Sequence, residues 1–230
     1  MATRFVSNRQ IYEEAILKIV PGARKRLWIA TADIKDMYVE KPGFRPDGIA
    51  KSSGDGFAMH YEKGEADGYE GCTRSGTPRI NGCFVLSQGA QRRAGNFGSA
   101  VKMVPFLQIL AELLRRGIEI RLIHAKEPGP AFRQDFDRFP GLWGGIERVL
   151  CPRVHFKCII ADGVRAYFGS ANLTGAGMGA KGENRRNFEN GVLTNDPALV
   201  EPLAEQFDSV WLGAYCSKCG RRQYCTDCPI

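Results

Sequence analysis

The stretch VHFKCIIADGVRAYFGSAN, residues 154–172, decides the fold of the second half of the chain. Two runs rich in apolar and β-branched residues flank the dipeptide Asp162-Gly163. Strand-like runs on both sides of Asp-Gly are a strong signal for a β-hairpin. Because side chains alternate along a strand, His155 and Lys157 should lie on the same face. The stretch therefore predicts a hairpin that places an imidazole beside a cation.

Further polar groups follow the second strand of this predicted hairpin. Ser170 and Asn172 return a hydroxyl and an amide toward the end where His155 lies. Gly169 lacks a side chain, so its backbone can approach a ligand closely. For a lone His-x-Lys, an ordinary buried hairpin would be the better interpretation. The added hydroxyl, amide and small residues in register favour a site for a phosphate-sized anion.

This arrangement of polar residues resembles the His-Lys-Asp motif of the phospholipase D superfamily, continued by its Gly-Ser-x-Asn extension. Members of that superfamily use a histidine to attack a phosphodiester and form a phosphohistidine, while a second motif's histidine protonates the leaving group. The resemblance implies that His155 is the nucleophile or the acid, and that Lys157 and Asn172 hold phosphate oxygens. It also implies that Ser170 adds a hydrogen bond and that Asp162 has a structural, hydrogen-bonding role.

The resemblance covers most of the chain in order. Residues 187–192 resemble the family's following strand, whose glutamate orients the histidine, so Glu189 is assigned that role. Elsewhere, apolar spacing and end signals, including Asn8 as a helix N-cap and Gly117 as a C-cap, mark the elements. Helices are expected at 9–20, 103–116 and 197–212, and strands at 27–32 and 118–124. The expected fold class is α/β, with a mixed central β-sheet flanked by helices on both faces.

The complete His-x-Lys-x4-Asp pattern occurs once in the 230 residues, at His155. In-line displacement of a phosphodiester needs a nucleophile on one side of the phosphorus and an acid on the other. Single-motif members of the superfamily, including small bacterial endonucleases and the Zucchini-type nucleases, resemble this chain. A twofold homodimer that pools two copies of His155 is therefore expected, and such closed dimers are the commonest oligomers.

Charge predicts a polyanionic partner. The formal net charge is +7 and the pI is about 9.0, which favours nucleic acid, DNA or RNA, over a membrane. Five clusters carry much of the positive charge: Arg24-Lys25-Arg26, Arg92-Arg93, Arg115-Arg116, Arg185-Arg186 and Arg221-Arg222. Arg115 and Arg116 suit a solvated helix end, whereas Arg185 and Arg186, just before Glu189, are candidate substrate-binding residues. No run of residues has the length of a spanning helix and no signal peptide is visible, so a cytoplasmic location is expected.

The cysteines at the end of the chain form a separate pattern. Cys216, Cys219, Cys225 and Cys228 make two Cys-x2-Cys pairs separated by five residues. Such pairs are typical of a tetrahedral zinc site, because each forms a tight turn that delivers two thiolates. Disulfides and an iron–sulfur cluster are the alternatives. A closed four-thiolate zinc site would be structural, and no cofactor is expected for catalysis.

The chain is expected to divide into a phospholipase D-like domain, 1–213, and a zinc knuckle, 214–230. Residues 38–99 are rich in glycine and too long for an ordinary connection, so they are interpreted as an insertion in the first domain.

The leading hypothesis is a metal-independent phosphodiesterase, a nucleic-acid endonuclease that works through a phosphohistidine. A phospholipid hydrolase of the same superfamily is the alternative enzyme, and a non-catalytic nucleic-acid-binding module is the alternative of another class.

Overall fold

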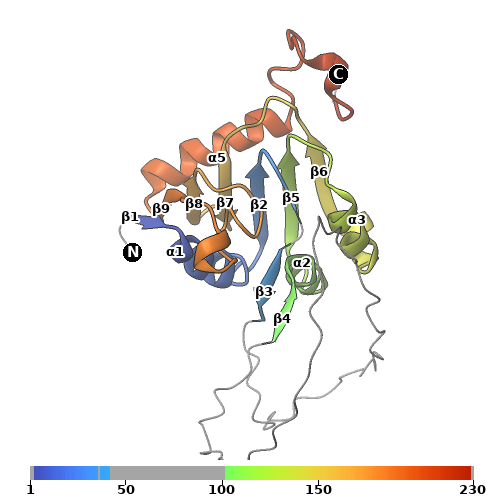
Figure 1. Cartoon of the computed structure of the whole chain (residues 1–230). Helices are drawn as coiled ribbons and strands as arrows, with labels where there is room; N and C mark the ends of the chain where they lie inside the picture. Colours follow the sequence, from blue (N-terminus) through green and yellow to red (C-terminus); the bar gives the residue numbers. More distant parts are fainter. Residues whose placement is uncertain (1–2, 36, 42–101, 229–230) are drawn as a thin grey trace, which may run out of the picture. The chain divides into compact units, whose positions relative to one another are not determined.

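The computed structural model describes residues 3–35, 37–41 and 102–228, which are arranged around one mixed β-sheet (Figure 1). The sheet has the strand order β1-β9-β8-β7-β2-β5-β6. Its strands are β1 Arg4–Ser7, β2 Arg26–Thr31, β5 Glu119–His124, β6 Ile146–Leu150, β7 Lys157–Ala161, β8 Arg165–Gly169 and β9 Asn190–Thr194. Strands β2, β5 and β6 are parallel, and the other neighbours pair antiparallel. The predicted mixed sheet is confirmed.

Helices cover both faces of this sheet. The described helices are α1 Arg9–Ile11, continued as the π-helix η1 Tyr12–Ile19, then α2 Phe106–Arg115, α3 Pro130–Asp137, α4 Gly141–Gly145 and α5 Pro197–Trp211, with the short 3-10 turns η2 Glu183–Arg185 and η3 Arg222–Tyr224. The side chains of η1, α2 and Ile159 of β7 form one hydrophobic core. Helix α5 and Cys158 and Ile160 of β7 form the other, in which Trp28 stacks on Phe207 with ring centroids 5.1 Å apart. Because side chains alternate along β7, this strand contributes residues to both cores.

The predicted hairpin is present as β7 and β8. Every residue of β7 is buried, because helices lie on both sides of it. Asp162 and Gly163 take positive φ values of 60° and 70°, which suits a tight connection after an Asp-Gly dipeptide. Lys157 faces Gly169 at the other end of the ladder. The hairpin therefore brings the start of β7 and the end of β8 to one edge of the sheet.

Three expected helices are found, with one changed boundary. Residues 103–105 were expected to be helical, but Met103–Pro105 form strand β4, which pairs antiparallel with β3 Tyr38–Glu40. Pro105 disfavours a helical conformation in the residue before it, so the helix starts only at Phe106. Gly117 has φ 78° and follows α2, as expected of a C-terminal glycine.

Most of the predicted insertion 38–99 lies outside the described residues. Its first residues, Tyr38–Glu40, belong to β3. The division at residue 213 into a domain and a knuckle stays a prediction. No helix within the described ranges is long and apolar enough to cross a membrane.

Candidate active site

The polar residues of the hairpin lie at the edge where parallel strands β2 and β5 end. Strand β7 runs antiparallel to β2, so its first residue, Lys157, comes next to the end of β2 at Thr31. The carboxyl end of parallel strands is where open α/β sheets bind their ligands. The topology therefore places the candidate site at the functional edge of the sheet.

His155 and Lys157 lie together there. The Nζ atom of Lys157 is 2.6 Å from the carbonyl oxygen of His155 and 3.4 Å from each nitrogen of its imidazole. Lys157 is only 6% exposed, whereas His155 is exposed. Burial lowers the pKa of Lys157, and the negative charge of Glu189 raises it in part. The pair presents an accessible imidazole with a buried cation behind it.

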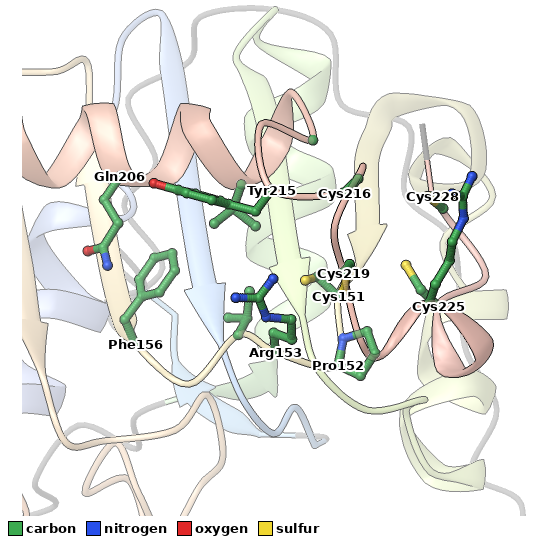
Figure 2. A pocket seen from close by; sticks show the side chains of 14 residues that line it. Cys151, Pro152, Arg153, Phe156, Gln206, Tyr215, Cys216, Cys219, Cys225 and Cys228 are labelled. Atoms are coloured by element: carbon green, nitrogen blue, oxygen red, sulfur yellow. The ribbon is translucent and has the colours of Figure 1, made fainter. Parts of the chain in front are cut away.

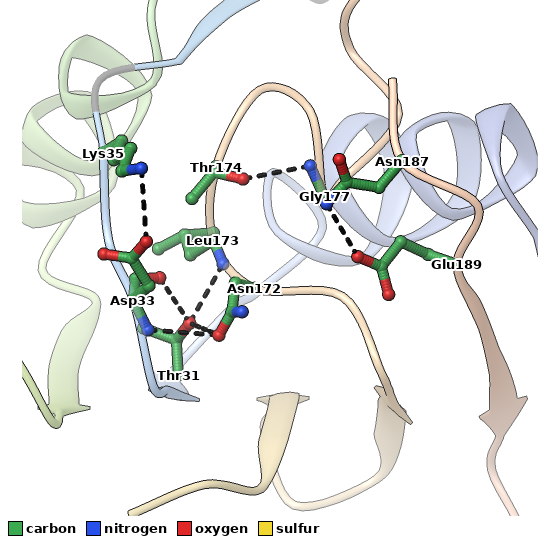
Figure 3. Close-up of polar contacts among 9 residues, drawn as sticks. All are labelled: Thr31, Asp33, Lys35, Asn172, Leu173, Thr174, Gly177, Asn187 and Glu189. Atoms are coloured by element: carbon green, nitrogen blue, oxygen red, sulfur yellow. Dashed lines mark hydrogen bonds and ion pairs between the residues drawn. The ribbon is translucent and has the colours of Figure 1, made fainter. Parts of the chain in front are cut away.

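Asn172 is held by the end of β2 (Figure 3). Its Oδ1 accepts a hydrogen bond from the backbone N–H of Asp33 at 3.1 Å and lies 3.4 Å from Thr31 Oγ1. The Thr31 hydroxyl in turn donates to the Asp33 carbonyl at 2.7 Å and accepts from the Leu173 N–H at 3.0 Å. Because its oxygen is engaged, Asn172 has its amide NH₂ group to donate to a phosphate oxygen.

Glu189 is fixed on the other side of the site. Its carboxylate accepts hydrogen bonds from the Ser170 hydroxyl and, at 3.1 Å, from Asn187 Nδ2. Its backbone N–H donates to Asn8 Oδ1 at 3.0 Å, and the Asn8 N–H donates to its carbonyl at 2.9 Å. In the described part of the chain no hydrogen bond joins Glu189 to His155. Its role in orienting the histidine therefore stays a prediction.

Asn8 takes the predicted N-cap position of the first helix, but its side chain does not cap that helix. Asn8 precedes α1 but makes no side-chain cap, and it adopts φ 49°. Its side chain accepts the Glu189 N–H instead. The contact between residues 181 positions apart in the sequence outcompetes the local one, which no local pattern could indicate.

Asp162 lies at the opposite end of β7 from His155. Five residues of strand separate the two ends by about 16 Å. The Asp162 carboxylate accepts hydrogen bonds from the backbone N–H groups of residues 24–26, at 2.8–3.1 Å. Burial raises the pKa of Asp162, but these three donors outweigh burial and lower it. The residue thus holds the start of β2, the kind of structural role that the family resemblance implied.

The two candidate substrate-binding arginines lie between Asn172 and Glu189 in sequence. Arg185 ends the turn η2 and is exposed. Arg186 is half-buried, with a guanidinium nitrogen 3.8 Å from Glu183. The backbone N–H of Asn187 donates to the Ala176 carbonyl at 3.0 Å, which closes this loop beside the site.

A second His-x-Lys, His124 and Lys126, lacks the aspartate because Ala131 stands at that position. His124 ends β5 and is 3% exposed, and its Nδ1 bonds to the Lys126 carbonyl at 2.8 Å. Burial lowers its pKa, so the neutral ring is favoured. This histidine is engaged within the fold and is poorly placed to reach a phosphate.

The four cysteines of the tail, with Cys151, line a cavity of about 260 Å³ (Figure 2). All five are partly exposed, and none of them forms a disulfide bond within the described residues. Within the described residues, no three Cys, His, Asp or Glu side chains are already placed as metal ligands. The predicted zinc site therefore stays a prediction.

Sequence reasoning missed four residues of the site, namely Asn8, Thr31, Asp33 and Asn187. Thr31 and Asp33 could have been found, since polar residues directly after a buried parallel strand mark a ligand-binding edge. Asn8 acts through a contact with Glu189 that is distant in sequence, and Asn187 acts through a local hydrogen bond to Glu189.

Comparisons with known proteins bear on this geometry. The family model described as cardiolipin synthase, PLD-like domain, matches residues 95–211, just over half of the chain. A mitochondrial cardiolipin hydrolase from Chlamydomonas reinhardtii is 27% identical over 104 residues, which cover 45% of this chain and 44% of that protein. The chain thus matches less than half the length of this curated relative.

Similar solved structures share the fold only loosely. Nuc from Salmonella typhimurium, a phospholipase D family member, is 14% identical with a TM-score of 0.49, covering 91% of this chain and 93% of Nuc. NucT from Helicobacter pylori is 10% identical with a TM-score of 0.48, covering 90% and 94% of the two chains. TrmBL2, an archaeal chromatin protein, is 11% identical with a TM-score of 0.47, covering 92% and 52%. Likeness at this level says nothing about function.

The contacts of Asp162 generate a prediction about stability. Asp162→Ala should lower the free energy of unfolding by about 1–3 kcal/mol, because three backbone N–H groups lose their acceptor. Asp162→Asn, which keeps one acceptor and tolerates positive φ, should lose less. Chemical denaturation at neutral pH checks both values.

The same contact should depend on pH. A carboxyl whose folded pKa is lowered stabilises the fold above its unfolded pKa of about 3.9 and loses that contribution as pH falls through the folded value. The stability gap between wild type and Asp162→Asn should therefore close in acid. A gap that stays constant with pH would show that the carboxylate charge does not matter here.

Proposed function

Since this chain belongs to the family described as cardiolipin synthase, PLD-like domain, within the phospholipase D superfamily, we propose that it hydrolyses nucleic-acid phosphodiesters through a phosphohistidine. Membership supports phosphodiester chemistry of the kind found in that superfamily, and hydrolysis, the nucleic-acid substrate and the mechanism are the proposal. The observation that carries it is the exposed imidazole of His155 with the buried Lys157 ammonium 3.4 Å from its nitrogens.

The first step forms a bond between an imidazole nitrogen of His155 and phosphorus, and breaks the bond from phosphorus to the leaving oxygen. Lys157 and the Asn172 amide would stabilise the negative charge that develops on the phosphoryl oxygens. The leaving oxygen takes a proton from an imidazolium on the far side. Water then attacks the phosphohistidine, that second imidazole takes a proton from the water, and the bond to His155 breaks.

A second copy of the chain would supply the second imidazole. The complete motif occurs once, and His124, the other described histidine, is buried and bonded to Lys126. In a homodimer whose twofold axis passes between the two copies of His155, both imidazoles would lie in one shared active site. Glu189, bonded to Ser170, would orient the histidine within each half.

Charge and exposure around the site support a nucleic-acid substrate. The net charge is +7, and Arg185 is exposed in the loop that leads to Glu189. Phe188, next to Glu189, is 97% exposed. Aromatic rings and guanidinium groups beside a cleavage site suit the bases and phosphates of an unpaired strand. A cytoplasmic location would give access to such substrates.

Phospholipid hydrolysis is the second candidate, favoured by the name of the relative from Chlamydomonas reinhardtii, a cardiolipin hydrolase. The chemistry at His155 would be the same. The two candidates differ in the groups on either side of the phosphate, so the substrate assay must include both.

Substitution of His155 tests the proposed mechanism. His155→Ala and His155→Asn should lower cleavage of a labelled oligonucleotide by at least about 10³-fold, because the nucleophile is lost. Lys157→Ala should lower it by about 10²–10³-fold, through loss of charge stabilisation. The matched control is His124→Asn, which keeps a donor for the Lys126 carbonyl and should cleave like wild type.

The controls separate the alternatives. Brief EDTA treatment should not change the rate, whereas a requirement for magnesium would indicate metal-assisted hydrolysis. Hydrolysis of cardiolipin vesicles with no cleavage of DNA or RNA would favour the second candidate. Binding of nucleic acid with neither activity would indicate a non-catalytic module.

Subunit mixing tests the dimer. When wild-type and His155→Ala chains exchange freely in equal amounts, activity should fall to about a quarter of the wild-type value, because heterodimers have one imidazole. Activity near one half would mean that each chain acts alone.

The role of Arg185 and Arg186 is tested by salt. Binding to nucleic acid releases counterions, so affinity should fall steeply as salt rises. Replacing both arginines by glutamine should lower the slope of log affinity against log salt by about one for each phosphate that they neutralise. The charge-matched control replaces Arg24 and Lys25, which are exposed beside Asp162 at the opposite edge of the sheet. If the slope changes only in the control variant, the nucleic-acid-binding surface would instead include Arg24 and Lys25.

A further inference from the structure

A groove lies at the end of strand β6, outside the candidate active site. It consists of two neighbouring hollows of about 330 Å³ and 180 Å³ that share three lining residues, Glu127, Trp143 and Arg148. Trp143 belongs to α4 and Arg148 to β6, whereas Glu127 follows β5. Side chains from three separate segments thus converge on one surface, here called the β6 groove.

The aromatic wall of the β6 groove is exposed but held in place. Trp143 is 64% exposed, and its ring packs edge-to-face on Phe136 with centroids 5.4 Å apart and planes at 82°. The Arg148 guanidinium lies over the same Phe136 ring, 5.1 Å from its centroid. Phe136 is buried in the hydrophobic core and belongs to α3, which lies beside β6 (Figure 1). One buried ring therefore positions an accessible indole and a guanidinium group together.

The β6 groove opens on the same face of the sheet as Lys157. Because side chains alternate along a strand, Lys157 projects to the same face as Ile159, and Arg148 to the same face as Ile146. Ile159 and Ile146 both belong to the core formed with η1 and α2. Lys157 and Arg148 therefore lie on one face.

The groove also lies at the same edge of the sheet as the candidate active site. Thr31, His124 and Leu150, the last residues of β2, β5 and β6, pair in one row, and Lys157 lies beside Thr31. Strand β6 is the third neighbour of β7, so about 14 Å separates them. A few nucleotides cover this span, since each adds about 3.4 Å even in a duplex. One strand can therefore reach both sites.

Charge indicates which part of a nucleotide fits the groove. The charged side chains that line the two hollows are Arg133 and Arg148 with Glu127, Asp137 and Asp227. Carboxylates outnumber guanidinium groups, so a phosphate would meet like charge. A nucleobase is neutral and can stack on an indole. Its amino groups can donate to a carboxylate, and its ring nitrogens and carbonyls can accept from a guanidinium.

We propose that the β6 groove binds an unpaired nucleobase of the strand that is cleaved at His155, stacked on Trp143 beside Arg148. This inference rests on the proposed function, because the same strand must also reach His155. A base within a duplex has both of its faces covered by neighbouring bases and cannot stack on Trp143 without leaving the helix. The chain should therefore cleave single strands in preference to duplexes.

Two substrates of different reach test the groove in the full-length chain. An oligonucleotide of about 10 nucleotides can occupy both sites, whereas bis(p-nitrophenyl) phosphate covers only the phosphate site. The measured quantity is the ratio of their kcat/KM values, since loss of folded or assembled protein lowers both equally. Trp143→Ala should lower this ratio by about 5- to 100-fold, the effect of losing one stacked base. It should also reduce the preference for single strands over duplexes.

Further variants keep the test decisive. Trp143→Phe keeps a ring and should retain most of the ratio, and Arg148→Gln should lower it even if Trp143→Ala folds poorly. The matched control is Phe5→Ala, which removes a ring that is 67% exposed on β1, at the other end of the sheet. This control should keep the wild-type ratio.

The possible failures are distinguishable. An unchanged ratio in Trp143→Ala and Arg148→Gln, while the wild type cleaves the oligonucleotide, would overturn this inference and leave the proposed function standing. Equal losses on both substrates, together with dissociation of a dimer, would identify Trp143 as a subunit contact and would also overturn it. A wild-type chain that hydrolyses the small diester but no nucleic acid would overturn the proposed nucleic-acid substrate itself.

Discussion

The pairing of β7 with β2 is the interaction on which the candidate site depends. Strand β7 is buried along its whole length. It pairs with β2 and β8 in a single register. A slip by one residue would exchange the faces of Ile159 and Ile160 and disrupt both cores. That register also brings Lys157 next to Thr31, and so joins the histidine segment to the loop that holds Asn172. The hydrophobic cores thus determine the geometry of polar groups at the sheet edge.

A buried cation is the main electrostatic cost of this arrangement. Lys157 is 6% exposed, and desolvation of an ammonium group is unfavourable without compensation. The His155 carbonyl at 2.6 Å and the charge of Glu189 compensate in part. A phosphate would supply the missing negative charge. Asn172 and Glu189 beside Lys157 are already held by hydrogen bonds to neighbouring residues.

The residues proposed for the chemistry and those proposed for substrate binding lie in different parts of the fold. Lys157 begins β7, His155 lies two residues before that strand, and Asn172 follows β8 and is held by hydrogen bonds at the end of β2. Arg185 and Phe188, which are proposed to contact the substrate, belong to the exposed loop before Glu189. The tail contacts the segment before His155 from another direction, through Leu150 and Asp227.

The sequence alone determined the hairpin, the mixed sheet and the closeness of His155 and Lys157. These follow from short-range rules, since strand alternation and the Asp-Gly turn act over a few residues. The placement of the helix 197–212 followed from the same kind of local signal, and the structure has it at Pro197–Trp211.

Only the tertiary structure decided how distant polar groups are used. Asn8 reads locally as a helix cap, but it binds Glu189 because β1 pairs with β9. Met103–Pro105 continue a helical pattern, but they become a strand because β3 offers a partner and Pro105 prevents an earlier helix start. Cys151 is far from the tail cysteines in sequence, and it lines a cavity with them only because β6 ends beside Asp227. Side-chain partners far apart in the chain are set by packing, and a sequence pattern does not contain that information.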